Sequence, residues 1–225
     1  MSDTMAAWDA IAASFDTTRR TPWPTVLDFI KNRPPGGVLV DLGCGNGRHL
    51  LPAIDCCTHG IGIDFSHKLL KITDTKIRTH QIDNLSLIQA NLCSLPLSDE
   101  KVDTILFIAA LHNIRGRHHR RQALTEIRRI LRPNGRALIS VWSRWQDKYR
   151  AHFLKDYIGH NAEFGDIEIS WRQHNLDIQR FYHLYSRSEF QTDLTIAGLR
   201  VRSLQAERFF SHRTPDNYFA EVSKD

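Results

Sequence analysis

The chain has 225 residues, of which 41% are hydrophobic, 24% charged and 9% aromatic, and its net charge is +5. These values are typical of a globular protein and exclude disordered and fibrous classes, and the length suits one α/β domain with additional segments. No apolar run approaches the roughly 20 residues that cross a bilayer, and residues 1–15 lack the order of a signal peptide, so we expect a cytoplasmic protein without membrane contact.

The N-terminal 35 residues are predicted to form two helices. Trp8 to Phe15 has the apolar spacing of a helix, Pro22-Trp23-Pro24 interrupts it, and Thr25 to Lys31 is predicted to be helical again. Pro34-Pro35-Gly36-Gly37 then ends the segment. We therefore expect a helical cap over residues 1–35 and a main domain over residues 36–225.

Strands and helices alternate in the main domain, which predicts a doubly wound, mostly parallel α/β sheet. The expected strands are Val38–Leu42, Gly60–Asp64, Ser86–Gln89, Val102–Ile108, Arg136–Trp142, Arg200–Arg208 and Asn217–Val222. The expected helices are Lys68–Thr79, His119–Leu131 and Ser188–Ala197, and the turn Pro133-Asn134-Gly135 is expected to end the second of them. Residues 143–185 show no steady period, and we expect an insertion there over one rim of the sheet.

A glycine-rich loop follows the first strand, where open α/β sheets bind ligands. The loop reads Asp41-Leu42-Gly43-Cys44-Gly45-Asn46-Gly47. It departs from the dinucleotide fingerprint G-x-G-x-x-G because the third glycine comes one residue early and Arg48 takes its place, which disfavours a nicotinamide oxidoreductase.

Polar residues follow the next two strands. Asp64 ends the second strand, where a carboxylate can accept hydrogen bonds from both hydroxyls of a ribose, and Asn91 follows the third, where an amide can read an adenine edge. This pattern resembles the class I S-adenosylmethionine-dependent methyltransferases, which implies a Rossmann-like seven-stranded sheet with helices on both faces. The resemblance implies a cofactor site made of Asp41, Gly43, Cys44, Gly45, Asn46, Asp64, Asn91 and Leu92.

Several motifs resemble the family that methylates the carboxymethyl group on the wobble uridine of tRNA to its methyl ester. They are Thr18-Arg19 with Pro22-Trp23-Pro24, Asp41 to Arg48, Ile108 to His112, Ala137 to Trp142, and Arg180-Phe181-Tyr182-His183-Leu184-Tyr185. Two positions depart from the family: His112 is followed by Asn113 instead of a second histidine, and Asn217-Tyr218-Phe219 stands where Asn-Trp-Trp is expected. With this resemblance, residues 1–35 are expected to cap substrate and cofactor.

The implied reaction needs positioning rather than a base, because a carboxylate with a pKa of roughly 4 is already ionised at pH 7. Arg19 is the candidate to hold the acceptor carboxylate, since its guanidinium fork matches that group. Trp23 and Trp142 are candidates to stack on the acceptor base, and His112 to donate a hydrogen bond to the acceptor. We expect these residues to be helped by the last motif, through Arg180, Tyr182, His183 and Tyr185.

Two partners are expected. Seven arginines lie between Arg115 and Arg132, and this density suggests contact with tRNA phosphates through Arg115, Arg117, Arg120 and Arg121, although a solvated helix face explains it as well. The strand Leu85–Gln89 is expected at a sheet edge, and the family resemblance implies a small zinc-ribbon activator protein docked there as a heterodimer.

Other functions share the same cofactor residues. A methyltransferase of small molecules is one alternative, and a non-catalytic S-adenosylmethionine-binding subunit or RNA-binding module is another. The four cysteines, Cys44, Cys56, Cys57 and Cys93, have no CxxC spacing, so we expect neither a metal site nor a disulfide framework.

Overall fold

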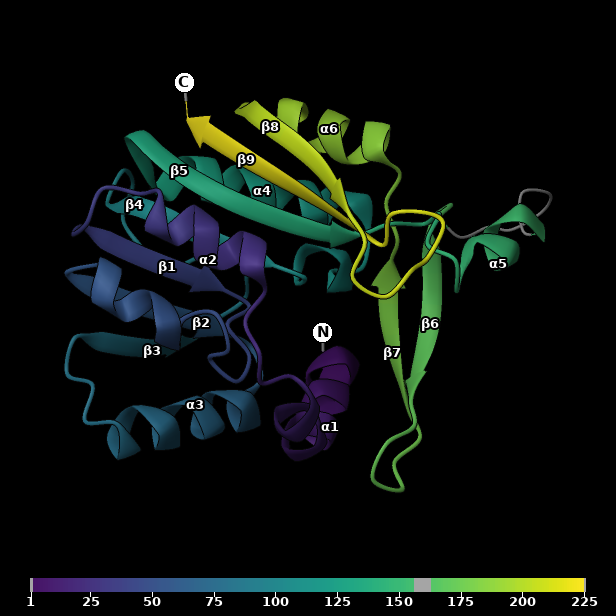
Figure 1. The fold of residues 1–225 in the computed structure, drawn as a ribbon, viewed down its shortest axis with the longest axis horizontal. Coiled ribbons are helices and arrows are strands. Elements are labelled where there is room, and N and C mark those ends of the chain that lie inside the picture. The colour runs from purple at the N-terminus through teal and green to yellow at the C-terminus, as the bar shows by residue number, and fades with distance from the viewer. Residues whose placement is uncertain (1, 156–162, 225) are drawn as a thin grey trace.

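A computed structural model describes residues 2–155 and 163–224, and these form a seven-stranded sheet with a separate two-stranded hairpin (Figure 1). The strand order is β3-β2-β1-β4-β5-β9-β8, and only the pairings of β9 with β5 and β8 are antiparallel. The strands are β1 (Val38–Leu42), β2 (His59–Asp64), β3 (Leu85–Gln89), β4 (Val102–Ile108), β5 (Leu131–Trp142), β8 (Leu199–Glu207) and β9 (Asn217–Lys224).

Helices cover both faces of the sheet, as the alternation predicted. The helices are α1 (Ser2–Thr18), α2 (Pro24–Lys31), α3 (His67–Thr79), α4 (Arg117–Ile130), α5 (Arg150–Lys155) and α6 (Arg187–Ile196). Neighbouring residues of a central strand belong to different cores: Phe107 of β4 packs with α4 and α6, whereas Leu106 packs with α2. This division follows from the two-residue period of a strand, which sends successive side chains to opposite faces. None of the described helices is long and apolar enough to cross a membrane.

The insertion expected over residues 143–185 contains α5 and a β-hairpin. The hairpin consists of β6 (Asp166–Trp171) and β7 (Ile178–His183) and projects beyond the sheet in Figure 1. The helix α1 packs against both α3 and β7. Trp171 Nε1 donates a hydrogen bond of 2.8 Å to Ser14 Oγ of α1, which joins the hairpin to the N-terminal helix.

The start of the fifth strand differs most in kind from the sequence prediction, whereas other boundaries differ by extension, as α1 does at both ends. The turn Pro133-Asn134-Gly135 was expected to precede the fifth strand, but β5 already begins at Leu131, which pairs with Val102. A register shift between Val102 and Thr104 accommodates the extra residues, and Asn134 takes a positive φ of 69°. An asparagine tolerates this conformation, so the turn is absorbed as an irregularity inside the strand pairing.

Candidate functional site

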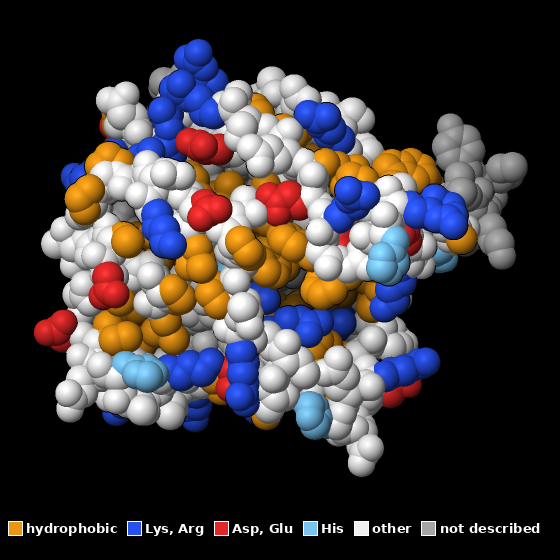
Figure 2. Space-filling view, viewed as in Figure 1, with side chains coloured by type: hydrophobic (Ala, Val, Ile, Leu, Met, Phe, Trp, Pro, Cys, Tyr) orange, Lys and Arg blue, Asp and Glu red, His pale blue; other side chains and the backbone are white. Residues whose placement is uncertain are grey.

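A cavity of about 2130 Å³ lies at the carboxyl ends of the parallel strands. Its lining comes from the glycine-rich loop, the segments after β2, β3, β4 and β5, the linker between α1 and α2, the hairpin, and the connection between β8 and β9. Figure 2 shows basic side chains inside a hollow beside the N-terminal helix. This volume exceeds an ordinary small-molecule pocket, so it has space for two ligands side by side.

The glycine-rich loop is shaped by backbone conformations and close approach. Gly43 and Gly45 have φ values of 69° and 56°, which L side chains rarely adopt. A Cβ on Gly43 would lie 2.5 Å from the Cβ of Ala110, so this position has no room for a side chain. Asp41 is buried beneath the loop and does not line the cavity, and burial with the nearby Asp64 charge raises its pKa to about 8.

Asp64 joins the end of β2 to the loop and faces the cavity. Its Oδ2 accepts a hydrogen bond from the backbone N–H of Gly45, and its Oδ1 accepts one from the backbone N–H of Ser66, each 2.8 Å long. Burial raises the pKa of Asp64 to about 6. Since each carboxylate oxygen has two lone pairs, Asp64 retains acceptor capacity for ribose hydroxyls.

The remaining expected cofactor residues differ in what their side chains contact. Cys44, Asn91 and Leu92 line the cavity, and Asn91 Oδ1 accepts a hydrogen bond of 3.0 Å from the backbone of Cys93. Asn46 is also at the cavity, but its amide donates to Asp16 Oδ1 over 2.8 Å and to the backbone carbonyl of Arg19 over 2.9 Å. Asn46 therefore ties the end of α1, and with it Arg19, to the glycine-rich loop.

Three aromatic rings form a wall of the cavity. The rings of Trp142 and Tyr182 stack with centroids 4.9 Å apart at 8°, and His112 lies 5.2 Å from the first and 5.5 Å from the second. His112 is only 1% exposed, and burial lowers its pKa to about 3. Its imidazole is therefore neutral at physiological pH and too weakly basic to take up a proton there, which suits the role of a hydrogen-bond donor.

Trp23 lines the cavity within a second aromatic group. Its ring stacks on Phe209 with centroids 5.0 Å apart, and it meets His49 and Phe219 edge-on. The guanidinium of Arg48 lies 5.0 Å from its centroid. Trp23 is thus held in place by several neighbours at the cavity wall.

Five arginines line the cavity, and four of them, Arg19, Arg20, Arg48 and Arg180, form no ion pair with a carboxylate of the described residues. Arg180 is buried over Trp171 and Tyr182, and its Nε has no hydrogen-bond partner. Burial and the charge of Arg180 lower the pKa of Arg19, and burial and the charge of Arg19 lower that of Arg48 to about 10. Such uncompensated cations favour an anionic ligand. Arg48 ends the motif Asp41 to Arg48, but no role for its side chain was predicted from the sequence.

The arginines between Arg115 and Arg132, in and around α4, do not form one exposed row. Arg115 is 63% exposed, pairs with Glu168 over 2.6 Å and lines the cavity, and Arg117 is partly exposed beside Glu163. Arg121 pairs with the buried Asp193 over 2.8 Å. Arg120 is 0% exposed, so the expectation that it contacts phosphate is corrected: its side chain faces the protein interior.

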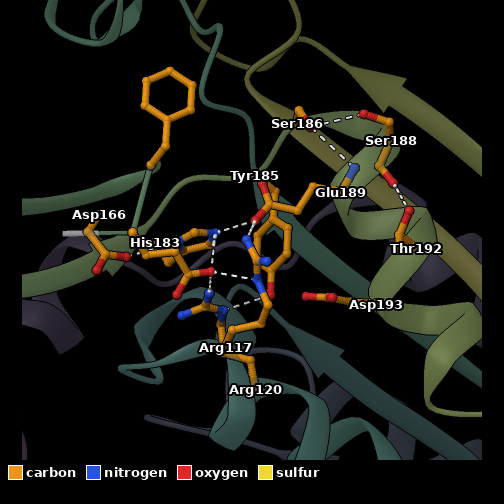
Figure 3. Close-up of polar contacts among 12 residues, drawn as sticks. Arg117, Arg120, Asp166, His183, Tyr185, Ser186, Ser188, Glu189, Thr192 and Asp193 are labelled. Atoms are coloured by element: carbon orange, nitrogen blue, oxygen red, sulfur yellow. Dashed lines mark hydrogen bonds and ion pairs between the residues drawn. The ribbon is translucent and has the colours of Figure 1, made fainter. Parts of the chain in front are cut away.

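Figure 3 shows the buried ionic network that holds Arg120. Arg120 Nε donates a hydrogen bond of 3.0 Å to the hydroxyl of Tyr185, and its Nη2 forms an ion pair of 2.5 Å with Glu163. His183 lies between Asp166, 2.7 Å from Nδ1, and Glu189, 2.9 Å from Nε2, and these two partners raise its pKa against the effect of burial. Among the motif residues, Arg180 and Tyr182 therefore line the cavity, whereas His183 and Tyr185 lie outside its lining and fasten the hairpin to α4 and α6.

The chain is similar in sequence to known methyltransferases. A family model described as a methyltransferase domain matches residues 40–139. The tRNA (carboxymethyluridine(34)-5-O)-methyltransferase of Schizosaccharomyces pombe is 31% identical over 206 residues, which are 85% of this chain and 86% of that protein. The protein of the same name from Arabidopsis thaliana is 36% identical over 140 residues, 62% of this chain and 32% of the relative. The chain spans about a third or less of the plant and vertebrate relatives.

Solved structures share the fold. The DhpI–SAM–HEP complex has a TM-score of 0.75 at 17% identity, covering 98% of this chain and 96% of that chain. A chain in the complex of the Haloferax volcanii Trm112 methyltransferase activator has a TM-score of 0.68 at 19% identity, with the same coverage of 98% and 96%. These similarities confirm the expected class I fold.

Proposed function

The chain belongs to the family of tRNA (carboxymethyluridine(34)-5-O)-methyltransferases, and we propose that it methylates a 5-carboxymethyl group on the wobble uridine of tRNA to the methyl ester. S-adenosylmethionine, when bound, supplies an electrophilic methyl group on a sulfonium. An oxygen of the acceptor carboxylate forms the new bond to that methyl carbon as the carbon–sulfur bond breaks, and S-adenosylhomocysteine leaves. No proton is transferred in this step.

The cofactor is supported by the fit of the loop and of Asp64. The backbone turns of Gly43 and Gly45 leave the cavity open beside Asp64, whose oxygens have acceptor capacity for the ribose. Leu92 and Asn91 lie beyond Asp64 along the lining and suit an adenine ring.

The observation that carries the proposal is the group Arg19, Arg48 and Arg180, which line the cavity without an ion-pair partner among the described residues. Two carboxylates would occupy the cavity during the reaction, that of the methionine part of the cofactor and that of the acceptor. Arg180 lies over Tyr182 of the aromatic wall, where an acceptor base would stack, and both Arg180 and Arg19 lie over the ring of Trp171. Positioning of this kind supplies roughly 7–11 kcal/mol when reacting atoms are held in line.

We assign residues 1–35 as the cap of this site. Arg19 and Trp23 reach the cavity from this segment, and Asn46 fixes it to the glycine-rich loop. The wobble uridine would be enclosed between the cap and the hairpin. We expect the enzyme to act on tRNA in the cytoplasm.

The test uses cofactor with a labelled methyl group and bulk tRNA from a strain that lacks the gene. The proposal expects label in tRNA, in a nucleoside whose mass corresponds to the methyl ester. Mild alkali should release this label as methanol, because an ester hydrolyses where N-methyl and ether groups do not. Alkali-stable label in tRNA would contradict the ester. Label only in small molecules would favour a methyltransferase of small molecules, and no transfer at all would favour a non-catalytic binding subunit.

A protein partner is proposed at the free edge of the sheet. The strand β3 lies at that edge, and its apolar residues Leu85, Leu87 and Ile88 are only partly buried. Such an edge invites strand addition by another chain. We propose a small zinc-ribbon activator there, which co-expression should recover as a heterodimer with higher activity and solubility. A monodisperse and fully active protein purified alone would contradict this.

A further inference from the structure

Phe210 is the most exposed large hydrophobic side chain of the described residues, at 82%. It lies in the connection between β8 and β9, residues 208–216, which we call the rim loop; Figure 1 shows this loop in yellow. Single exposed hydrophobic residues are common and need no explanation by themselves. Phe210 differs from the exposed Ile196 because it lies at the cavity described above.

The rim loop is held by two carboxylates. Asp216 accepts hydrogen bonds from the backbone N–H groups of Phe209, Phe210 and Ser211, with lengths of 2.9, 2.7 and 3.0 Å. Asp147 accepts hydrogen bonds from the backbone N–H groups of His212, Arg213 and Thr214, with lengths of 2.9, 2.9 and 3.2 Å. The backbone on both sides of Phe210 is thereby fixed, so its ring is presented to solvent at a defined place.

Aromatic rings connect Phe210 with the interior of the site. Its centroid lies 6.5 Å from that of Phe209, edge-on, and Phe209 stacks on Trp23 at 5.0 Å. This row runs from solvent to the cavity wall. A ligand that enters the cavity with one base would meet Phe210 with a neighbouring one.

The surroundings of Phe210 are cationic. Arg208, Arg213 and Lys148 are exposed, and none of them forms an ion pair with a carboxylate in the described part of the chain. The two acids that hold the rim loop, Asp147 and Asp216, are occupied by its backbone N–H groups. Such a setting suits a phosphate backbone better than an apolar protein surface or a lipid tail.

We propose that Phe210 stacks on an unpaired base of the RNA substrate adjacent to the base that enters the cavity. This inference rests on the proposed function and names a residue that selects the substrate loop. Bases of single-stranded loops are recognised by stacking on aromatic side chains, and this contact is insensitive to base identity. Phe210 would therefore favour a splayed loop over a duplex without reading its sequence.

The experiment measures binding and not only turnover. The probe is an anticodon stem-loop RNA with 2-aminopurine at the nucleotide after the wobble position, added to the full chain together with its partner if one is required. Fluorescence of the probe should be quenched on binding to the wild type. Phe210→Ala should weaken binding by about tenfold and abolish the quench, Phe210→Trp should retain both, and Ile196→Ala is the matched control for loss of an exposed apolar side chain.

Three outcomes distinguish the possibilities. Phe210→Ala that binds and quenches as the wild type overturns the stacking contact and leaves the proposed function intact. Wild-type protein that binds no stem-loop RNA overturns both. Phe210→Ala that keeps RNA affinity but loses the activator protein assigns Phe210 to a protein interface instead. Calorimetry of the cofactor should give the same affinity for all variants, because Phe210 lies at the mouth and not beside Asp64.

Discussion

The backbone N–H of Trp142 donates a hydrogen bond of 3.1 Å to Nδ1 of His112. This contact determines the tautomer, because a neutral imidazole whose Nδ1 accepts a hydrogen bond must carry its proton on Nε2. The Nε2–H is then a donor at the cavity wall. His112 is thus arranged to hold an acceptor oxygen and not to remove a proton from one.

The rate should therefore show no titration of His112 near neutral pH. With a pKa of about 3 in the folded protein, His112 stays neutral between about pH 6 and 8, and the acceptor carboxylate is ionised throughout. His112→Ala should lower kcat, and the shape of the pH profile of kcat should be the same as in the wild type. An ionisation in that range that disappears in His112→Ala would contradict an ionised acceptor.

The same lowered pKa has a consequence for stability. His112 binds protons in the unfolded state below about pH 6.5 but in the folded state only near pH 3, so protonation favours unfolding. The wild type should lose stability as pH falls through this window. In His112→Asn this part of the loss should be absent, which melting curves of both proteins from pH 7 to 4 would measure.

Arg19→Ala should abolish most turnover and leave cofactor affinity unchanged, if Arg19 holds the acceptor carboxylate. Arg19→Lys keeps the charge but not the fork, so it should recover only part of the rate. Steady-state kinetics with tRNA and calorimetry with the cofactor separate the two effects, and Arg78→Ala, an exposed arginine paired within α3, is the control. Equal loss of cofactor affinity would assign Arg19 to the cofactor carboxylate instead.

Asp64→Asn should weaken binding of the cofactor by roughly 1.5–3 kcal/mol, which is the range for hydrogen bonds to charged groups. Because burial raises the pKa of Asp64 to about 6, the carboxylate is protonated progressively below that pH. Cofactor affinity of the wild type should therefore fall as pH decreases below about 6, and that of Asp64→Asn should not. Calorimetry at pH 7.5 and 5.5 measures this, with melting temperatures as a check on the contacts to Gly45 and Ser66.

Substitutions of the exposed Arg115, which precedes α4, and of the buried Arg120 within α4 should have different effects. Arg115→Glu should raise the KM for tRNA, more strongly at low salt, with an unchanged melting temperature. Arg120→Met should instead lower the stability by roughly 1–3 kcal/mol, since it removes the donor to the buried Tyr185 hydroxyl and one of the two arginine partners of Glu163. Adding Glu163→Gln should restore part of that loss. A raised KM in Arg120→Met without destabilisation would contradict its structural assignment.

The sequence predicted the sheet well because its signals are local. The strand Val38–Leu42 is short, apolar and followed at once by glycines, and it is observed at those residues. The edge position of Leu85–Gln89 is confirmed as well. The hairpin was missed as such, because its strands pair with each other and with no part of the main sheet.

The site was predicted less completely because it depends on contacts between distant segments. Arg120 and Arg115 look alike in the sequence, and the buried one is distinguished by its contacts with Glu163 and Tyr185, 43 and 65 residues beyond Arg120. Similarly, the juxtaposition of Arg19 with Arg180 depends on the packing of α1 on β7. No pattern along the chain encodes these distances.

The hydrogen bond between Ser14 and Trp171 also governs when the cavity can form during synthesis. The two residues are separated by 157 positions, so α1 leaves the ribosome long before the hairpin on which it rests. The strands β1 to β4 and the glycine-rich loop can associate first, because their contacts lie closer in sequence. The wall that contains Arg180 and Tyr182 is added only after the hairpin has been synthesised. A nascent chain can thus form the outline of a nucleotide site well before it can hold an acceptor.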